Sequence, residues 1–261
     1  MAELLVITNA DDFGLSHEVN AAVELLHQKG VLSSATIMAN GSALDEVKAI
    51  HDRNPELGLG VHLNATNFRA LTPAMRQSVL CDESGSFASN FRTEHRLSMT
   101  GLLAQEWLAQ VTRLQDLGIA LDHLDSHHHV HTWPAALPAL QMVSKSSGIP
   151  WVRNTRNCVS SVERVGMRSK LKYAGKSIWS RASMALGLKL TGGFCSVLDY
   201  KGILEEGRLD LERLGSLELM CHPGDWGNEE YVEEVDWLSE CFLETLKSGW
   251  TLGNYRNFHQ H

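Results

Sequence analysis

Short apolar runs alternate along the chain with segments whose apolar residues recur at helical spacing. The apolar runs predict strands at Leu4–Thr8, Ser33–Ala39, Leu57–Leu63, 119–126, near Ile149–Arg153, near 193–198 and at 216–221. The helical pattern covers 16–29, Ser42–Arg53, 100–117, 134–147 and 229–248. Ser16 is placed to cap the first helix, and a proline opens the fourth. This alternation of strand and helix is typical of an α/β protein with a parallel sheet, and we expect one domain over residues 1–261.

Two segments break the rhythm. Residues 66–99 are polar and rich in turn formers, which predicts a long loop over the strand ends. Residues 164–189 carry seven Lys or Arg and no Asp or Glu, with Tyr173 and Trp179 interleaved. We favour a solvated helix beside the mouth of the sheet for this segment. The alternative is a cationic amphipathic surface for an anionic or lipid-linked substrate.

Composition narrows the functional classes. Hydrophobic residues make up 43% of the chain and charged residues 21%, which is ordinary for a globular protein with a packed core. The net charge of −8 argues against nucleic acid as a partner. The five cysteines are scattered and form no C-x-x-C pair, as expected in a reducing compartment. Residues Leu4–Ile7 read as a strand rather than a signal peptide, and no apolar run could span a bilayer. We expect a cytoplasmic protein without stable membrane insertion.

The chemically capable residues gather where predicted strands end. The first strand leads into NADDFG (9–14), the third ends in GVHLN (60–64), the fourth in DSHHHVH (125–131), and a late strand in CHPG (221–224). In parallel α/β folds these ends meet on one side of the sheet and form the ligand site. If strand alternation continued through the fourth segment, Asp125, His127, His129 and His131 would share one side. The alternative for that segment is a mobile His-rich loop.

These residue types favour a hydrolytic metal site. The adjacent carboxylates Asp11 and Asp12 repel each other unless they share a cation or a proton, although an Asx-turn is an alternative. One carboxylate with two imidazoles leaves coordination positions open for water and substrate, and a second carboxylate can act as base. His62 alone could be a core histidine. His222, before Pro-Gly, could be a turn histidine, a general acid or an oxyanion stabiliser.

The four motifs together resemble those of the YdjC-like carbohydrate deacetylases, which include chitooligosaccharide deacetylases. They occur in that family's order and at similar spacing, over nearly the whole chain. The resemblance implies a distorted (β/α) barrel similar to the NodB-type polysaccharide deacetylases. It also implies an enzyme that removes an acetyl group from an N-acetylated sugar or oligosaccharide with one divalent metal ion.

Carried over to this chain, the resemblance implies that Asp12, His62 and His127 bind the metal. Asp11 would be the general base and His222 the general acid that protonates the leaving amine. The family is usually described with Mg²⁺, whereas an Asp-His-His set suits Zn²⁺ or another transition metal better. The other expected substrate contacts or supports are Asn64, His129, His131, Arg153 (which could instead orient Asp11), Trp133 and Trp226.

Two other functions fit parts of the pattern. A metal-dependent phosphoesterase, or another amide or ester hydrolase, could use a related barrel, but such phosphoesterases often have two metals and more carboxylates. A non-catalytic sugar- or metal-binding protein would need neither Asp11 nor His222. The sequence leaves open the sugar, its chain length and the acetyl position. It also leaves open the oligomeric state, with a homodimer as one outcome.

Overall fold

The computed structural model describes residues 3–88, 97–156, 158, 167–207, 211–224 and 227–259. Within these residues, nine strands form one sheet in the order β6-β5-β4-β3-β2-β1-β8-β7, with β9 paired to β1. Every strand pairing is parallel. The strands are β1 (Leu4–Phe13), β2 (Ser34–Ile37), β3 (Gly58–Leu63), β4 (His123–Ser126), β5 (Trp151–Val152), β6 (Lys189–Leu190), β7 (Gly193–Ser196), β8 (Ser216–Cys221) and β9 (Trp250–Leu252).

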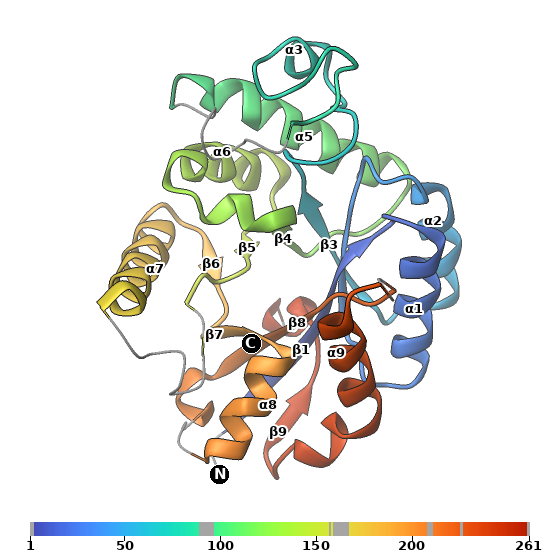
Figure 1. The fold of residues 1–261 in the computed structure, drawn as a ribbon, viewed down its shortest axis with the longest axis vertical. Coiled ribbons are helices and arrows are strands. Elements are labelled where there is room, and N and C mark those ends of the chain that lie inside the picture. The colour runs from blue at the N-terminus through green and yellow to red at the C-terminus, as the bar shows by residue number, and fades with distance from the viewer. Residues whose placement is uncertain are drawn as a thin grey trace.

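The sheet curls into an incomplete barrel, and the helices lie around its outside (Figure 1). In the described part of the chain no ladder joins β6 to β7, so the barrel stays open there. The α/β fold and the distorted barrel expected from the sequence are confirmed. The helices are α1 (His17–Gln28), α2 (Leu44–Arg53), α3 (Pro73–Arg76), α5 (Thr100–Asp116), α6 (Leu137–Ser147), α7 (Met167–Ala185), α8 (Val197–Glu206) and α9 (Glu229–Glu240).

Elements with a strong local signal lie where the sequence predicts them. β8 has the predicted bounds, and Ser16 caps α1 by accepting a hydrogen bond from the Val19 amide. The basic segment contains α7, whose Leu171 and Ile178 are exposed. No helix among the described residues combines the length and apolarity needed to cross a bilayer.

Several predicted bounds are wrong. β1 runs on to Phe13 instead of ending at Thr8, because buried polar partners keep Asn9 and Asp11 inside the sheet. The last long helix ends at Glu240, and a separate 3-10 turn over Phe242–Thr245 buries Phe242. Within 134–147, a 3-10 turn precedes α6, and the fourth strand is confined to His123–Ser126.

The C-terminal segment closes one end of the curled sheet. β9 pairs with Leu4–Val6 of β1, and a 3-10 turn, η7 (Tyr255–His259), follows it. Two glycines of β3 leave room for close neighbours, one in the C-terminal segment and one in β4. A Cβ at Gly58 would lie 2.7 Å from the Asn254 side chain, and one at Gly60 would lie 2.5 Å from the His123 ring.

Candidate metal centre and active site

A backbone irregularity brings both aspartates of the NADDFG motif to the same site. The pairing of β1 with β2 shifts register between Ala10 and Phe13, and Asp12 has a left-handed φ of 67°. Neighbouring side chains of a regular strand would point to opposite faces. Aspartate tolerates the left-handed region better than most residues, so the bulge is accessible to this sequence at modest cost. Asp11 and Asp12 therefore contact different partners within one cluster.

Three potential ligand atoms converge on one point. Asp12 Oδ1 lies 2.8 Å from His127 Nδ1 and 3.2 Å from His62 Nε2. One atom from each of these residues lies within 4.8 Å of the others. Although Asp12 Oδ1 is buried and close to both nitrogens, it accepts no hydrogen bond of acceptable geometry. Buried carboxylate oxygens are rarely left in this state, and a shared cation would satisfy this one.

Each histidine of this trio is oriented through its other ring nitrogen. His62 Nδ1 lies 2.7 Å from Asp125 Oδ1, and His127 Nε2 lies 3.0 Å from the Asn67 side-chain amide. Histidines that bind metals usually have such a partner on the second nitrogen, which fixes the tautomer and the ring plane. A proton on His127 Nε2 would need an acceptor, which Asn67 can supply by turning its amide.

The charges of the cluster also fit a divalent cation. Three carboxylates, those of Asp11, Asp125 and Glu218, surround the guanidinium of Arg153, and the Asp12 carboxylate lies close by, against His62 and His127. Burial opposes protonation of His62, yet Asp125, Asp11 and Asp12 hold its pKa well above the ordinary value. Burial also opposes ionisation of Asp12, but His127 and His62 hold its pKa well below the ordinary value. Extra positive charge at this point would therefore be stabilised.

A second group of possible ligand atoms, from Asp11, His62 and Asp125, lies within the same 4.8 Å limit. Arg153 already contacts both of these carboxylates, at 2.6 to 2.8 Å. A cation is therefore present there without a metal. The trio of Asp12, His62 and His127 is the better candidate, and its mixed nitrogen and oxygen donors suit Zn²⁺ and related transition metals.

Asp11 is held by Arg153 beside the trio. Arg153 Nη1 lies 2.7 Å from Asp11 Oδ2 and Nη2 lies 2.6 Å from Oδ1, so the guanidinium grips the carboxylate through two parallel hydrogen bonds. Arg153 is fully buried. Of the two roles expected for it, orienting Asp11 agrees with this geometry, whereas a buried side chain has no surface for a substrate.

His222 follows β8 and approaches Asp11 from the other side. Its Nε2 lies 3.9 Å from Asp11 Oδ2, and its Nδ1 lies 3.5 Å from Glu234 Oε2 of α9. The ring stacks on Tyr231 of the same helix, with centroids 4.3 Å apart. Burial opposes protonation of His222, but Glu234 and Asp11 outweigh it and raise its pKa above the ordinary value. The arrangement favours an imidazolium that can donate a proton.

The prediction that four side chains of the DSHHHVH segment share one side is wrong. β4 ends at Ser126, and the chain enters a 3-10 turn in which His128 and His129 both adopt left-handed backbone conformations. Only His127 joins Asp12. Non-glycine residues with a left-handed backbone conformation are uncommon and cluster at functional sites.

The other imidazoles of this segment diverge. His128 is exposed, with Nδ1 3.0 Å from the Thr66 hydroxyl. His129 packs edge-on against Phe194, and burial together with Arg153 lowers the pKa of His129 to about 3. His131 is fully buried and lies 2.6 Å from the Ser126 hydroxyl. At neutral pH both His129 and His131 are uncharged, since burial and then His129 hold the pKa of His131 well below its ordinary value.

The remaining predicted site residues differ in accessibility. Asn64 is fully buried; its amide oxygen accepts from the backbone of Thr66 and Asn67, and its nitrogen donates to Asn40 and to the Asn67 carbonyl. Trp133 follows the histidine turn and is 37% exposed. Trp226 lies outside the described residues.

Several residues of the site were not expected from the sequence, among them Glu218, Glu234 and Tyr255. Glu218 lies within an apolar strand, and that lone carboxylate between leucines was the available signal of a buried partner. Glu234 is one of several acidic residues of α9, and Tyr255 follows the last strand, so neither position stands out in the sequence.

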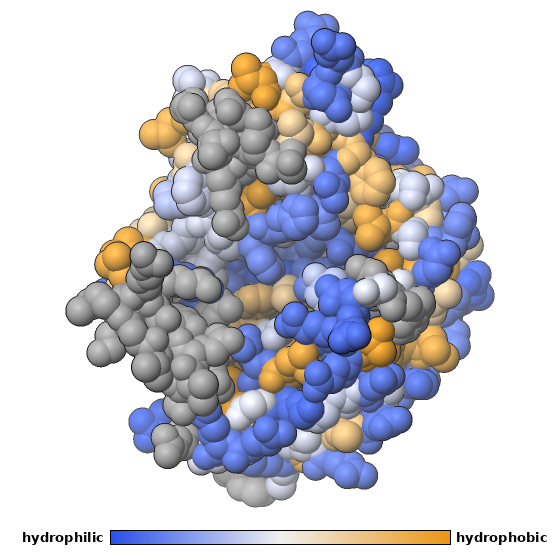
Figure 2. All heavy atoms as spheres, in the orientation of Figure 1, coloured by the Kyte–Doolittle hydropathy of each residue, from blue (hydrophilic) through white to orange (hydrophobic). Residues whose placement is uncertain are grey.

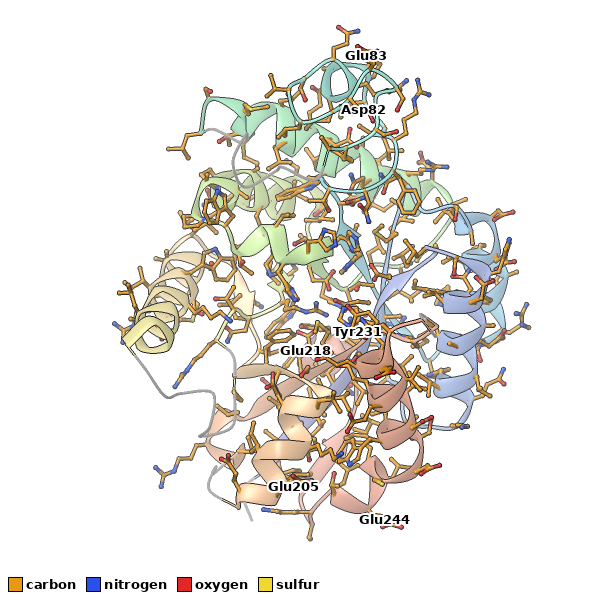
Figure 3. The ribbon with its side chains drawn as sticks, in the orientation of Figure 1. Asp82, Glu83, Glu205, Glu218, Tyr231 and Glu244 are labelled. Carbon is orange, nitrogen blue, oxygen red and sulfur yellow. The ribbon has the colours of Figure 1, made fainter. Side chains whose placement is uncertain are left out.

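Glu218 and Tyr231 both lie near the centre of the molecule in Figure 3, whereas Asp82 and Glu83 lie at its upper edge. Hydrophilic residues surround a hollow near the centre of the same face (Figure 2).

Comparison with known proteins gives a consistent family assignment. The profile of the YdjC-like protein family matches residues 5–247. A protein of Vibrio cholerae serotype O1 named carbohydrate deacetylase is 38% identical over 220 residues, which cover 84% of this chain and 77% of the relative. A protein of the same name from Halalkalibacterium halodurans is 29% identical over 239 residues, covering 88% and 86%.

Comparison of structures supports the fold. A crystal structure from Enterococcus faecalis V583, of a protein whose proposed role is cellobiose-phosphate cleavage, superposes with a TM-score of 0.78 over 99% of both chains at 23% identity. At this identity the likeness concerns the fold alone. The family match, which spans most of the chain, and the Vibrio relative lead to one conclusion: this chain belongs to the YdjC-like protein family.

Proposed function

We propose that the protein is a metal-dependent carbohydrate deacetylase that hydrolyses the acetamide of an N-acetylated sugar or oligosaccharide. The observation that carries the proposal is the convergence of Asp12, His62 and His127 on one point, with Asp11 and His222 close to each other beside it. The names of the relatives, carbohydrate deacetylase, support the substrate class. A non-catalytic metal-binding protein would not need a neighbouring acid and base.

The residues of the trio would hold one divalent ion through Asp12 Oδ1, His62 Nε2 and His127 Nδ1. When bound, such an ion polarises an amide carbonyl and lowers the pKa of water. Zn²⁺ fits the donor set better than Mg²⁺, because two of the three donors are imidazoles.

Asp11 acts as the general base in this proposal. Arg153 donates to both carboxylate oxygens, which fixes the plane of the carboxylate. Because Oδ1 also accepts from Asn9 Nδ2 at 3.0 Å, the lone pair left for the attacking water is on Oδ2. His222 acts as the general acid and protonates the departing nitrogen, since an unprotonated amine is a very poor leaving group. Glu234 favours the charged imidazolium that this step requires.

The other polar residues take supporting parts. Asn64 uses its amide within the loop, so we propose that it orders residues 64–67 and thereby presents Asn67 to His127. Trp133 is the accessible aromatic residue beside the histidine turn and would stack on a pyranose ring. His129, neutral and partly accessible, would contact the acetyl end of the substrate, while His131 supports the turn through Ser126.

The proposal is tested by measuring acetate release from N-acetylglucosamine, its short β-linked oligomers and other N-acetylated sugars. Protein stripped of metal by a chelator should release none, and restoring Zn²⁺, Co²⁺, Mn²⁺ or Mg²⁺ should recover the activity. A phosphate monoester serves as a control for the alternative hydrolase. Release of phosphate without acetate would overturn the proposal.

A further inference from the structure

A buried carboxylate with no contact to the proposed metal trio lies beneath the site. Glu218, on β8, is fully buried, and its flanking residues Leu217 and Leu219 are apolar. Its Oε1 accepts a hydrogen bond from Arg153 Nε at 2.8 Å, and its Oε2 accepts one from the Tyr255 hydroxyl at 2.6 Å. Burying an ionised carboxylate is costly unless it is paired and hydrogen-bonded. Packing alone therefore does not account for a glutamate at this position of β8.

The contact with Glu218 determines how the Arg153 guanidinium is turned. The guanidinium is planar and presents its donors in a rigid fork. With Nε bound to Glu218, Nη1 reaches Asp11 at 2.7 Å and Asp125 at 2.8 Å, and Nη2 reaches Asp11 at 2.6 Å. The Phe194 ring covers the group, with its centroid 5.0 Å from Cζ. Because the guanidinium contacts both Asp11 and Asp125, any rotation of it would disturb its contacts with both carboxylates at once.

Both of those carboxylates matter to the proposed chemistry. Asp11 is the proposed base, and Asp125 orients His62 through the 2.7 Å contact to its Nδ1. The guanidinium thus directly contacts both the proposed base and the partner of a proposed metal ligand. Holding it on three sides restricts the site to one arrangement.

The last member of this chain of contacts comes from the C-terminal segment. Tyr255 is fully buried, and its ring stacks on His123 with centroids 4.0 Å apart. β9 anchors the segment to β1, and Arg256 binds the carbonyls of Pro55 and Leu57. Tyr255 lies beyond residue 247, where the family match ends.

We propose that Glu218 and Tyr255 are positioning residues for the deacetylation: together they fix the orientation of Arg153, and through it those of Asp11 and Asp125. The inference rests on the proposed function for the identity of the reaction. The geometric part, that Tyr255 and Glu218 hold Arg153 in place, stands on the contacts alone.

The test uses the metal-loaded full chain and the variant Tyr255→Phe, which removes only the hydroxyl. Its control is Tyr200→Phe, because Tyr200 is also buried and its hydroxyl also meets a side chain, Thr245, at 3.2 Å. At saturating metal we expect kcat for acetate release to fall about tenfold in Tyr255→Phe, in the range found for partners that orient active-site groups, with KM unchanged. Tyr200→Phe should keep the wild-type kcat. Equal kcat values for the two variants would overturn the inference.

A second variant and a second readout keep the two proposals separable. Glu218→Gln retains the shape of the side chain but removes its charge, and its kcat should fall further than that of Tyr255→Phe.

The second readout is the hydrogen exchange of the Arg153 Nε proton, followed by NMR and assigned with Arg153→Lys. Exchange should be slow in the wild type and in Tyr200→Phe, and faster in Tyr255→Phe. If the wild type releases no acetate, the proposed function fails, and this exchange comparison still decides whether Tyr255 holds Arg153. An unchanged exchange rate of the Arg153 Nε proton in Tyr255→Phe would rule out the positioning role of Tyr255.

Discussion

Asp11 and Asp12 are adjacent in the sequence but contact different partners, because the left-handed backbone at Asp12 turns two neighbouring carboxylates into one site. Asp12 contacts the two imidazoles, and Asp11 contacts the guanidinium. This division of contacts predicts that the two proposed functions of the site, metal binding and proton transfer, can be separated by mutation.

The variant pair Asp11→Asn and His127→Ala tests that separation. We expect Asp11→Asn to retain one metal ion per chain and to lose about 10²-fold or more in kcat, the usual contribution of a general base. His127→Ala should lose both metal and activity, because it removes a ligand atom. Metal content by atomic spectroscopy and acetate release on the same samples provide the readout. Near-normal turnover in Asp11→Asn would show that another group takes the proton.

Glu234 helps to raise the pKa of His222. A general acid must carry its proton, so activity is present below the pKa of His222 and is lost as the pH rises through it. Glu234 is one of the groups that raise this pKa above its ordinary value against the effect of burial. In Glu234→Gln the alkaline limb of the kcat/KM profile should therefore move to lower pH. Glu230→Gln, exposed on the same helix, is the control and should leave the profile in place. An unshifted limb in Glu234→Gln would remove His222 from the role of acid.

At the scale of elements, β3 shows how strand composition makes room for the site. Gly60 faces the His123 ring, which is buried and stacked on Tyr255 and so has little freedom to move. Gly60→Ala should lower the free energy of unfolding by about 1–3 kcal/mol, as overpacking of a core does. Gly101→Ala, in α5 with open space at its Cβ, is the matched control and should be neutral or stabilising. Denaturant unfolding of both variants gives the comparison, and equal stabilities would show that the His123 ring yields easily.

The elements also show what the sequence could and could not predict. β8 and the start of α1 follow from an apolar run and a capping serine, which act locally. β5 and β6 have two residues each and exist because neighbouring strands pair with them, so no local pattern marks β6. The histidine turn after Ser126 departs from the strand through left-handed conformations that residue type does not announce. The four strand-end motifs identify the candidate residues; the partners that orient them, Glu218 and Tyr255, depend on the closed end of the sheet.

At the scale of the whole molecule, the curled parallel sheet brings the ends of β1, β3, β4 and β8 together, and the C-terminal segment closes the opposite end. The carboxylates of Asp11, Asp125 and Glu218 and the guanidinium of Arg153 are thereby buried in one cluster, with the half-buried Asp12 beside it. We therefore propose that the fold concentrates these carboxylates to bind a divalent ion beside a base and an acid.

The most direct test of this claim is a titration of chelator-stripped protein with Zn²⁺, followed by acetate release from an N-acetylglucosamine oligomer. We expect the rate to be negligible without metal and to rise in proportion to added Zn²⁺ up to one equivalent per chain, where it levels off. Acetate release that is already maximal in the stripped protein would contradict the account. So would the absence of acetate at every metal concentration and with every N-acetylated sugar.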